Sequence, residues 1–300
     1  MNYKKSTWSL LKLCFSSTLL VMFISIQSAN SQSARVDSVV PVVAFLKTAK
    51  DGTIPNEQNK VGTGFFVLDT KTNNLLLITA RHVIDTLTPN SLVVIRIKDD
   101  LPQELSLVQL TGVNSPLPWK VHPIADVAVL KLNPTKEIVP LLAGHALFRE
   151  HLLEKLEAPS RDVPLTILGF PIGIGVQGRF SPISRETKAA SGLLNLPQIS
   201  TATIFLLQDP IAGGFSGSPV FEFPGARPST RAAIEIGGRF ACVGLASGTI
   251  SDITGGKLGV VVPAQYILEA IDTGIAVSAL QEKQNPKGVV KSRTTLKRRP

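Results

Sequence analysis

An all-β fold is what the spacing of apolar residues predicts for this 300-residue chain. Apolar runs of strand length, several of them rich in Val, Ile and Phe, recur between turn signals along most of the sequence. The 23 glycines and 21 prolines are scattered without a period, which suits many short strands and turns. Only two segments have a helical pattern, and the sequence contains no internal repeat. Many short strands with few helices are typical of β-barrels or a β-sandwich.

The predicted elements follow one another from residue 39 to residue 271. The strands cover residues 39–46, 63–68, 75–79, 91–97, 127–132, 165–170, 203–207, 219–223, 240–246 and 258–262. The helical segments are residues 141–156 and a stretch that begins near Pro263 and reaches Ile271. We place the boundary between two halves within 141–162, which divides the folded part into residues 32–150 and 151–275.

Residues 1–31 have the parts of a secretory signal peptide. Lys4 and Lys5 supply a positive start, an apolar run follows over residues 10–26, and small residues occupy positions 28–31. The sequence therefore predicts an exported protein, periplasmic or secreted. The alternative is a membrane anchor that is not cleaved, although Lys12 and three hydroxyl residues interrupt the apolar run.

The positive charge of the chain is concentrated at its two ends. The formal net charge is +9, but ten of the 31 basic residues and one of the 22 acidic residues lie in the leader and beyond residue 280, which leaves 21 of each. A nucleic-acid-binding surface is therefore not expected on the folded part. Residues 276–300 are predicted to be a disordered basic tail that can contact anionic surfaces of the cell envelope.

Cysteine chemistry is not expected to contribute to the function. Cys14 lies in the leader, so the mature chain would keep Cys242 alone, without a disulfide or a cysteine zinc site. Cys242 lies in an apolar run and is predicted to be a buried, unreactive thiol. We expect neither a metal nor an organic cofactor.

Three short segments carry residues suited to nucleophilic catalysis. A buried strand leads to His82, Asp126 opens a second apolar strand, and Ser216 lies in a glycine-rich turn before a third. A serine hydroxyl becomes a nucleophile when a neutral imidazole takes its proton, and a buried carboxylate fixes the tautomer of that imidazole. In the Gly-x-Ser turn, the N–H groups of Gly214 and Ser216 can both face the oxyanion of a tetrahedral intermediate.

These segments resemble, in this chain order, the motifs of the chymotrypsin/trypsin-like serine peptidases. The chain has Thr-Ala-Arg-His at 79–82, Asp-Val-Ala-Val-Leu at 126–130 and Gly-Phe-Ser-Gly-Ser-Pro at 214–219. The segment Gly-Phe-Pro-Ile-Gly at 169–173 is similar to one found in the bacterial HtrA/Deg and glutamyl-endopeptidase branches. The resemblance covers about residues 39–271, and no PDZ-type domain fits after it.

This resemblance implies both a fold and an activity. The fold would be two six-stranded antiparallel β-barrels with the site in the cleft between them and a C-terminal helix. The activity would be that of a secreted serine endopeptidase acting on protein or peptide substrates, with His82, Asp126 and Ser216 as catalytic triad and Gly214 and Ser216 as oxyanion hole. The alternative is a catalytically inactive binding protein of the cell envelope on the same scaffold.

Four residues near the expected nucleophile are candidates for the substrate pocket, namely Ala212, Ala246, Ser247 and Gly248. Neither alanine offers a charge, so small or medium apolar side chains are expected there. Asp209 could instead form the floor of the pocket and select basic side chains, while a purely structural carboxylate is the other interpretation. Phe215 replaces the acid that pairs with a freed N-terminus in trypsin, so no activating cleavage is expected.

Overall fold

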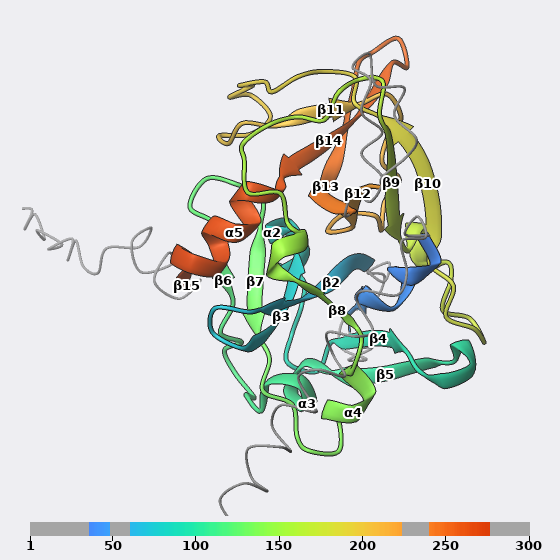
Figure 1. The fold of residues 1–300 in the computed structure, drawn as a ribbon, viewed down its shortest axis with the longest axis vertical. Helices are drawn as coiled ribbons and strands as arrows, with labels where there is room; N and C mark the ends of the chain where they lie inside the picture. The colour runs from blue at the N-terminus through green and yellow to red at the C-terminus, as the bar shows by residue number, and fades with distance from the viewer. Residues whose placement is uncertain (1–35, 49–60, 224–239, 277–300) are drawn as a thin grey trace, which may run out of the picture.

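The computed structural model describes residues 36–48, 61–223 and 240–276, which form two β-sheets and a helix near the C-terminal end. Figure 1 shows the sheets as two lobes, with helix α5 (Ala264–Thr273) against the flank of the first. The predicted all-β fold with a C-terminal helix is thereby confirmed. The leader and all but the first residue of the predicted tail lie outside the described residues. Within the described ranges, no helix has both the length and the apolar composition needed to cross a membrane.

The first sheet contains nine strands within the described residues, in the order β15-β6-β7-β3-β2-β1-β4-β5, with β8 beside β2. The strands are β1 Val43–Lys47, β2 Val61–Asp69, β3 Asn74–Thr79, β4 Leu92–Arg96, β5 Pro102–Ser106, β6 Lys120–Val121, β7 Ala128–Lys131, β8 Ala146–Phe148 and β15 Ile275–Ala276. Helix α3 (Leu107–Thr111) follows β5, and the carbonyl of its Leu110 accepts from the N–H of Asn133, just beyond β7. The sheet curls into a half-barrel that this contact draws together.

Strand β8 departs from the expected purely antiparallel barrels, because it runs parallel to β2 with Phe66 opposite Ala146. The predicted helix over 141–156 is wrong: this stretch holds the end of α4 (Val139–Leu142), then β8, then the 3-10 turn η4 (Arg149–His151). Pairing with β2 satisfies the backbone groups of the segment as a helix would, and it buries Leu147 in the core. Tertiary contacts therefore override the local helical pattern.

The second sheet has the expected six strands, in the order β10-β9-β12-β13-β14-β11. They are β9 Pro164–Gly169, β10 Ile183–Lys188, β11 Phe205–Leu207, β12 Pro219–Glu222, β13 Ala241–Ser251 and β14 Lys257–Pro263. A bridge between Ala189 and Leu207 joins its two edge strands, and the N–H of Ala190 donates to the carbonyl of Leu206 at 2.7 Å. The sheet is therefore closed on itself as a barrel.

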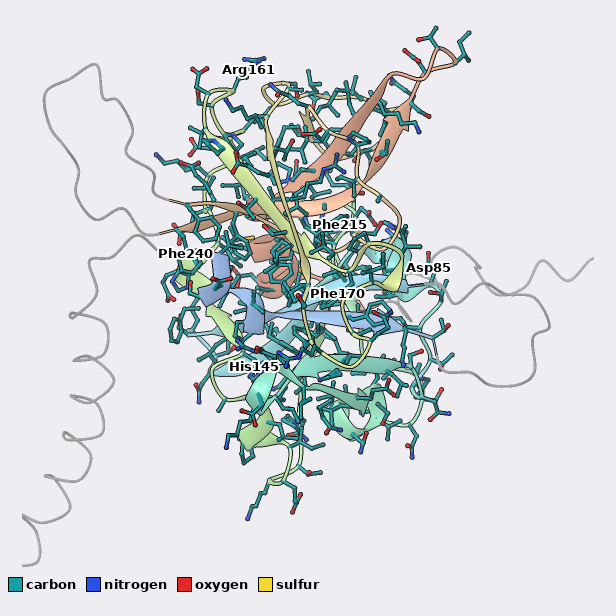
Figure 2. All side chains as sticks on the ribbon, turned by 90° about the vertical axis from the view of Figure 1, so that its right-hand side faces the viewer. Asp85, His145, Arg161, Phe170, Phe215 and Phe240 are labelled. Carbon is teal, nitrogen blue, oxygen red and sulfur yellow. The ribbon has the colours of Figure 1, made fainter. Side chains whose placement is uncertain are left out.

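The phenylalanines Phe170 and Phe215, labelled in Figure 2, pack beside the turn that carries Ser216. Phe170 directly follows β9, yet its ring packs 5.5 Å from that of Phe45 in β1. Phe215 is 2% exposed and lies in the core of the second barrel, so the turn that carries Ser216 is anchored by apolar packing. Cys242 in β13 is fully buried, as predicted, and burial raises the pKa of its thiol to about 12.

Candidate active site

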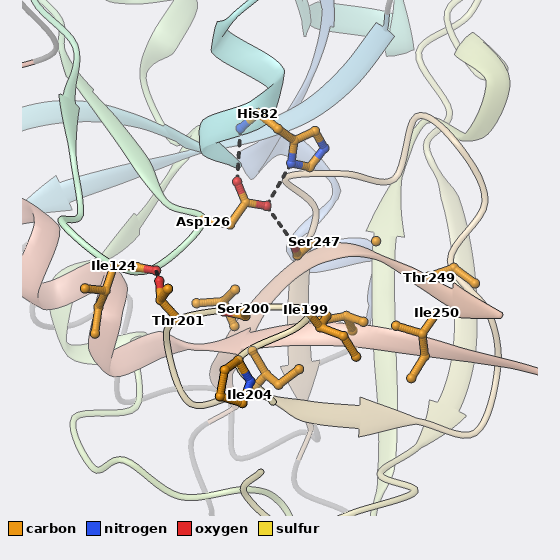
Figure 3. Close-up of a pocket in the computed structure, with 14 residues that line it drawn as sticks. His82, Ile124, Asp126, Ile199, Ser200, Thr201, Ile204, Ser247, Thr249 and Ile250 are labelled. Carbon is orange, nitrogen blue, oxygen red and sulfur yellow. Dashed lines mark hydrogen bonds and ion pairs between the residues drawn. The ribbon is translucent and has the colours of Figure 1, made fainter. Parts of the chain in front are cut away.

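The carboxylate of Asp126 contacts His82 at two points. The backbone N–H of His82 donates to Oδ1 of Asp126 at 3.0 Å, and its ring Nδ1 lies 2.8 Å from Oδ2. Figure 3 draws both contacts. The carboxylate is less exposed than the imidazole, at 24% against 49% of the side chain. Asp126 therefore holds the ring with Nδ1 toward itself, which leaves Nε2 free to face a reacting group.

The pairing of strands β3 and β7 explains why these two residues meet. The register places Thr79 of β3 opposite Ala128 of β7 in an antiparallel ladder. His82 follows the end of β3, in helix α2 (Arg81–Ile84), and Asp126 lies just before the start of β7. The C-terminal end of one strand and the N-terminal start of its antiparallel partner lie side by side, so the two side chains lie close together.

The electrostatics of the pair favours a charged Asp126. The hydrogen bond to Asp126 raises the pKa of His82 above its ordinary value, against the opposing effect of burial. For Asp126, burial alone would raise the pKa, but the bonds and charge of His82 and the hydroxyl of Ser247 outweigh it and lower the pKa. The carboxylate is therefore ionised near neutral pH, and it stabilises the imidazolium over the neutral ring.

Ser216 lies in a turn between β11 and β12 that requires glycine on both sides. Gly214 has a φ of 97° and Gly217 a φ of 89°, where L-residues are strained. A Cβ on Gly214 would lie 2.4 Å from the carbonyl oxygen of Phe170, and one on Gly217 would lie 2.0 Å from that of Thr63. Gly217 therefore lies directly against the first sheet, and Gly214 against the segment that follows β9.

Thr63 of β2 holds this turn through its backbone and its side chain. Its N–H donates to the carbonyl of Ser216 at 2.9 Å, and its Oγ1 donates to the carbonyl of Gly214 at 2.8 Å. The same Oγ1 accepts from the N–H of Phe170 at 3.1 Å. The residue is fully buried, so each of these bonds is shielded from water.

The N–H groups expected to form an oxyanion hole have no acceptor among the described residues. The carbonyl of Gly213 accepts from the N–H of Ile172 at 2.7 Å, so the N–H of Gly214, across a trans peptide plane, points to the other side. The turn gives the N–H of Ser216 no protein acceptor either. Both donors are therefore available to a ligand.

Ser247 links the nucleophile candidate to the carboxylate. Its carbonyl accepts from Oγ of Ser216 at 3.1 Å, and its hydroxyl donates to Oδ2 of Asp126 at 2.5 Å. The described residues contain no hydrogen bond between Ser216 and His82. Ser247 was predicted in the pocket wall but not as a partner of Asp126, because nothing in an Ala-Ser-Gly stretch indicates which way the hydroxyl points.

A cavity of about 490 Å³ opens beside His82 and Asp126 (Figure 3). Of the four predicted pocket residues, Ser247 and Gly248 line it, whereas Ala212 and the fully buried Ala246 do not. Apolar side chains form much of the rest of the wall: Ile124, Pro197, Ile199, Ile204, Ile250, Val260 and Val262. The cavity is suited to apolar side chains of a bound peptide.

A threonine joins the two segments that carry the expected pocket walls at 212 and 246–248. Oγ1 of Thr249 accepts from the N–H of Ile211 at 2.6 Å and donates to its carbonyl at 2.8 Å. The side chain of Ile211 is 7% exposed, and a Cβ on Gly259 would lie 3.0 Å from its Cγ1. Thr249 therefore ties the segment of Ile211 to strand β13.

Asp209 lies beside Arg185 rather than alone on a pocket floor. Its Oδ1 is 3.4 Å from Nη2 of Arg185, and Nη1 of the same guanidinium donates to the carbonyl of Pro210 at 2.8 Å. The carboxylate already has a cationic partner, which favours the structural interpretation of Asp209 over selection of basic substrates.

Comparisons with known proteins return only similar structures. No family model and no curated protein matches the chain. Among solved structures, it is similar to an inactive form of Rv3671c from M. tuberculosis at 16% identity, covering 79% of this chain and 88% of that one, with a TM-score of 0.43. It is similar to human heparin binding protein at 13% identity, 80% and 93% coverage and a TM-score of 0.45.

A third similar structure is the scabies mite inactivated protease paralogue S-I1, at 13% identity, 80% and 97% coverage and a TM-score of 0.48. At these levels of identity and similarity, the functional assignment depends on the geometry of the chain's own residues.

Proposed function

We propose that this chain, which has the two-barrel all-β fold of the trypsin-like serine peptidases, is a serine endopeptidase that cleaves peptide bonds through an acyl-enzyme. The observation that carries the proposal is that Ser247 contacts both Ser216, through its carbonyl, and Asp126, through its hydroxyl, while Asp126 is hydrogen-bonded to His82. The three residue types of a nucleophile, a base and an orienting acid therefore lie at one site. No metal or organic cofactor has a part in the proposed reaction.

In the proposed mechanism, Ser216 attacks the carbonyl carbon of the substrate. Its hydroxyl turns from the carbonyl of Ser247 toward Nε2 of His82, which accepts the proton, and catalytic hydrogen bonds of this kind often form only with substrate bound. The charge of Asp126 stabilises the resulting imidazolium. His82 then donates the proton to the leaving amine, and the same steps with water in place of the serine release the acid product.

The oxyanion of each tetrahedral intermediate would lie against the N–H groups of Gly214 and Ser216. Both are already directed away from protein acceptors, so the site needs little rearrangement as negative charge develops. The turn is held by Thr63 and by the buried Phe215, which supports an oxyanion hole that forms on folding, without an activating cleavage.

A fluorophosphonate probe tests the proposal directly, because it reacts with a serine only where a base and an oxyanion hole activate it. We expect one labelled serine, mapped by peptide sequencing to Ser216. Ser218 provides a matched internal comparison, since it lies two residues away with a fully buried hydroxyl. Absence of labelling at pH 7 to 8, with the protein folded, would favour the inactive binding protein instead.

The bridge from Thr249 to Ile211 lies between the segments expected to form the pocket walls, and from it we predict a preference for glycine or alanine at the residue whose carbonyl is attacked. Larger side chains would have to displace Thr249 and Ile211, and a misfit of one or two methylenes costs on the order of 10- to 100-fold in kcat/KM. The measurement is a peptide-library profile of cleavage sites. A profile dominated by Phe, Leu, Arg or Lys at this position would contradict the prediction.

A pair of variants assigns the preference to the hydroxyl bridge. Thr249→Gly removes the side chain and is expected to raise kcat/KM for leucine at the attacked residue by about tenfold. Thr249→Ser keeps the hydroxyl that bonds Ile211, and it should retain the preference of the unmodified chain.

Thr63 gives a second prediction, since its hydroxyl supports the turn of Ser216. Thr63→Val keeps the shape of the side chain but leaves the buried carbonyl of Gly214 without its donor, which costs about 1–3 kcal/mol. We expect roughly a tenfold loss in kcat with little change in KM. Thr63→Ser restores the hydroxyl and should recover most of the rate; equal kinetics of the valine and serine variants would refute the role.

A further inference from the structure

His122 is a buried titratable residue that the proposed mechanism does not use. It is 4% exposed and lies between the short strand β6 and Asp126. Its ring Nδ1 faces two backbone donors, the N–H of Ala125 at 2.9 Å and that of Ile124 at 3.3 Å. A ring nitrogen that faces two donors must act as the acceptor, so the proton of the neutral ring lies on Nε2.

The protonated side of the ring reaches the C-terminal helix. Nε2 of His122 lies 2.9 Å from Oε2 of Glu269 in α5, and Oε1 of the same carboxylate accepts from Nε2 of Gln265 at 2.7 Å. The ring of Tyr266 packs edge-on against the imidazole, with the centroids 5.0 Å apart. The imidazole is therefore held in position and in tautomer by one turn of helix α5.

The bonds made by Nδ1 hold the backbone immediately before Asp126. The N–H of Ala125 points at the ring, and its carbonyl accepts from the N–H of Val127 at 2.8 Å. The N–H of His122 in turn donates to the carbonyl of Val127 at 3.0 Å, which closes the loop around Asp126. The direction of the Asp126 side chain thus depends on this loop, and the imidazole of His122 accepts the hydrogen bonds of the N–H groups inside it.

The same helix also holds the facing wall of the cavity. The hydroxyl of Tyr266 accepts from the N–H of Thr203 at 3.2 Å, and Oγ1 of Thr201 donates to the carbonyl of Ile124 at 2.7 Å. Figure 3 shows Ile124 and Thr201 side by side at the cavity wall. Helix α5 therefore supports two loops, of which one carries Asp126.

We propose that His122, held by Glu269 of α5, is a positioning residue for Asp126, and that it sets the geometry in which Asp126 orients His82. This inference rests on the proposed function, because it assigns His122 a part in the same reaction. A role confined to fastening α5 to the first sheet would predict loss of stability alone, without a change at His82.

Two substitutions of His122 separate the two sides of its ring. His122→Asn places an amide oxygen near the position of Nδ1, so it keeps the acceptor for Ala125 and loses the donor to Glu269. His122→Gln reaches toward Glu269 but removes the acceptor from the Nδ1 position. We expect His122→Gln to lower kcat about tenfold with KM unchanged, because the orienting carboxylate is displaced. His122→Asn should stay within about threefold of the unmodified enzyme.

The second readout is the pKa of His82, followed by titrating the histidine ring signals in NMR spectra. Asp126 raises this pKa, so its displacement in His122→Gln should move the His82 titration to lower pH, whereas His122→Asn should leave it in place. Thermal unfolding of both variants accounts for any difference in stability. Equal kcat losses with an unmoved His82 titration would overturn the inference.

This design separates failure of the inference from failure of the proposed function. The titration of His82 needs no turnover, so it can be measured even if the chain hydrolyses nothing. A chain that no fluorophosphonate labels but whose His82 titration shifts in His122→Gln refutes the peptidase proposal and supports the positioning role. A labelled, active chain whose His122→Gln variant has unchanged kcat and His82 titration refutes the positioning role alone.

Discussion

Replacing Ser216 by alanine is expected to lower kcat for peptide hydrolysis by about 10⁴- to 10⁶-fold while leaving the fold intact. The substitution removes the nucleophile and a single hydrogen bond, to the carbonyl of Ser247, which contributes about 1 kcal/mol to stability. The glycines of the turn and the buried Phe215 are unchanged. The measurement is single-turnover cleavage of a peptide with alanine at the attacked residue, together with a thermal unfolding curve.

Ser218→Ala is the matched control for this variant. The hydroxyl of Ser218 is buried and, within the described part of the chain, has no hydrogen-bond partner, so its removal should leave both activity and stability near those of the unmodified protein. Hydrolysis by Ser216→Ala at the rate of the parent would exclude Ser216 as nucleophile. Equal losses in the two serine variants would indicate a disturbed turn instead of a lost nucleophile.

The second large effect is expected for Asp126→Asn, with kcat near neutral pH falling by about 10⁴-fold. The carboxylate accepts from the ring and the backbone N–H of His82 and from the hydroxyl of Ser247. An amide keeps one acceptor oxygen and presents an NH₂ group, which can donate to Nδ1 of His82. The ring would then carry its proton on Nε2 and could not accept the proton of Ser216.

The pH dependence of this variant is an independent check. Only the unprotonated ring of His82 acts as a base, so kcat/KM should rise with pH through the pKa of His82, which Asp126 raises. Removing the negative charge removes this stabilisation of the imidazolium, so the residual activity of Asp126→Asn should rise at lower pH than that of the parent. A pH–rate profile for each protein is the measurement.

Asp85 supplies the control for charge alone. It is an exposed carboxylate whose charge also contributes to raising the pKa of His82, through space and as the smallest of the four influences. Asp85→Asn should therefore move the pH–rate profile slightly toward lower pH and leave the maximal rate unchanged. A maximal rate in Asp126→Asn equal to that of the parent would remove Asp126 from the mechanism.

Local patterns in the sequence predicted the elements that are built from buried apolar residues. The ten predicted strands all overlap observed ones, because buried strands leave runs of Val, Ile, Leu and Phe. The final helix and the buried Cys242 were predicted from the same apolar patterns. The resemblance of their motifs to those of the serine peptidases implied that His82 and Asp126 act together, and they meet in the structure because the strands beside them are antiparallel neighbours.

Strands with polar faces were not predicted. Strand β10 has the sequence Ile-Ser-Arg-Glu-Thr-Lys and β5 has Pro-Gln-Glu-Leu-Ser, and neither contains an apolar run. Each is held by backbone bonds to one neighbouring strand, β9 and β4 respectively, and such bonds leave little trace in side-chain composition. Strand β8, with the sequence Ala-Leu-Phe, was not predicted either, because it lies within a stretch whose pattern favours a helix.

The finer features of the site depend on side-chain directions across the two barrels, which only the tertiary structure decides. Ser247 contacts Asp126 across 121 residues of sequence, and Thr63 reaches the carbonyl of Gly214 across 151. The bridge from Thr249 to Ile211 and the contact of His122 with Glu269 are likewise long-range. The sequence by itself determined which residues are candidates for the chemistry, since the three motifs are local patterns. The tertiary structure decided how the side chains of these residues are held in position, because their hydrogen-bond partners are far away in the sequence and no local pattern can specify them.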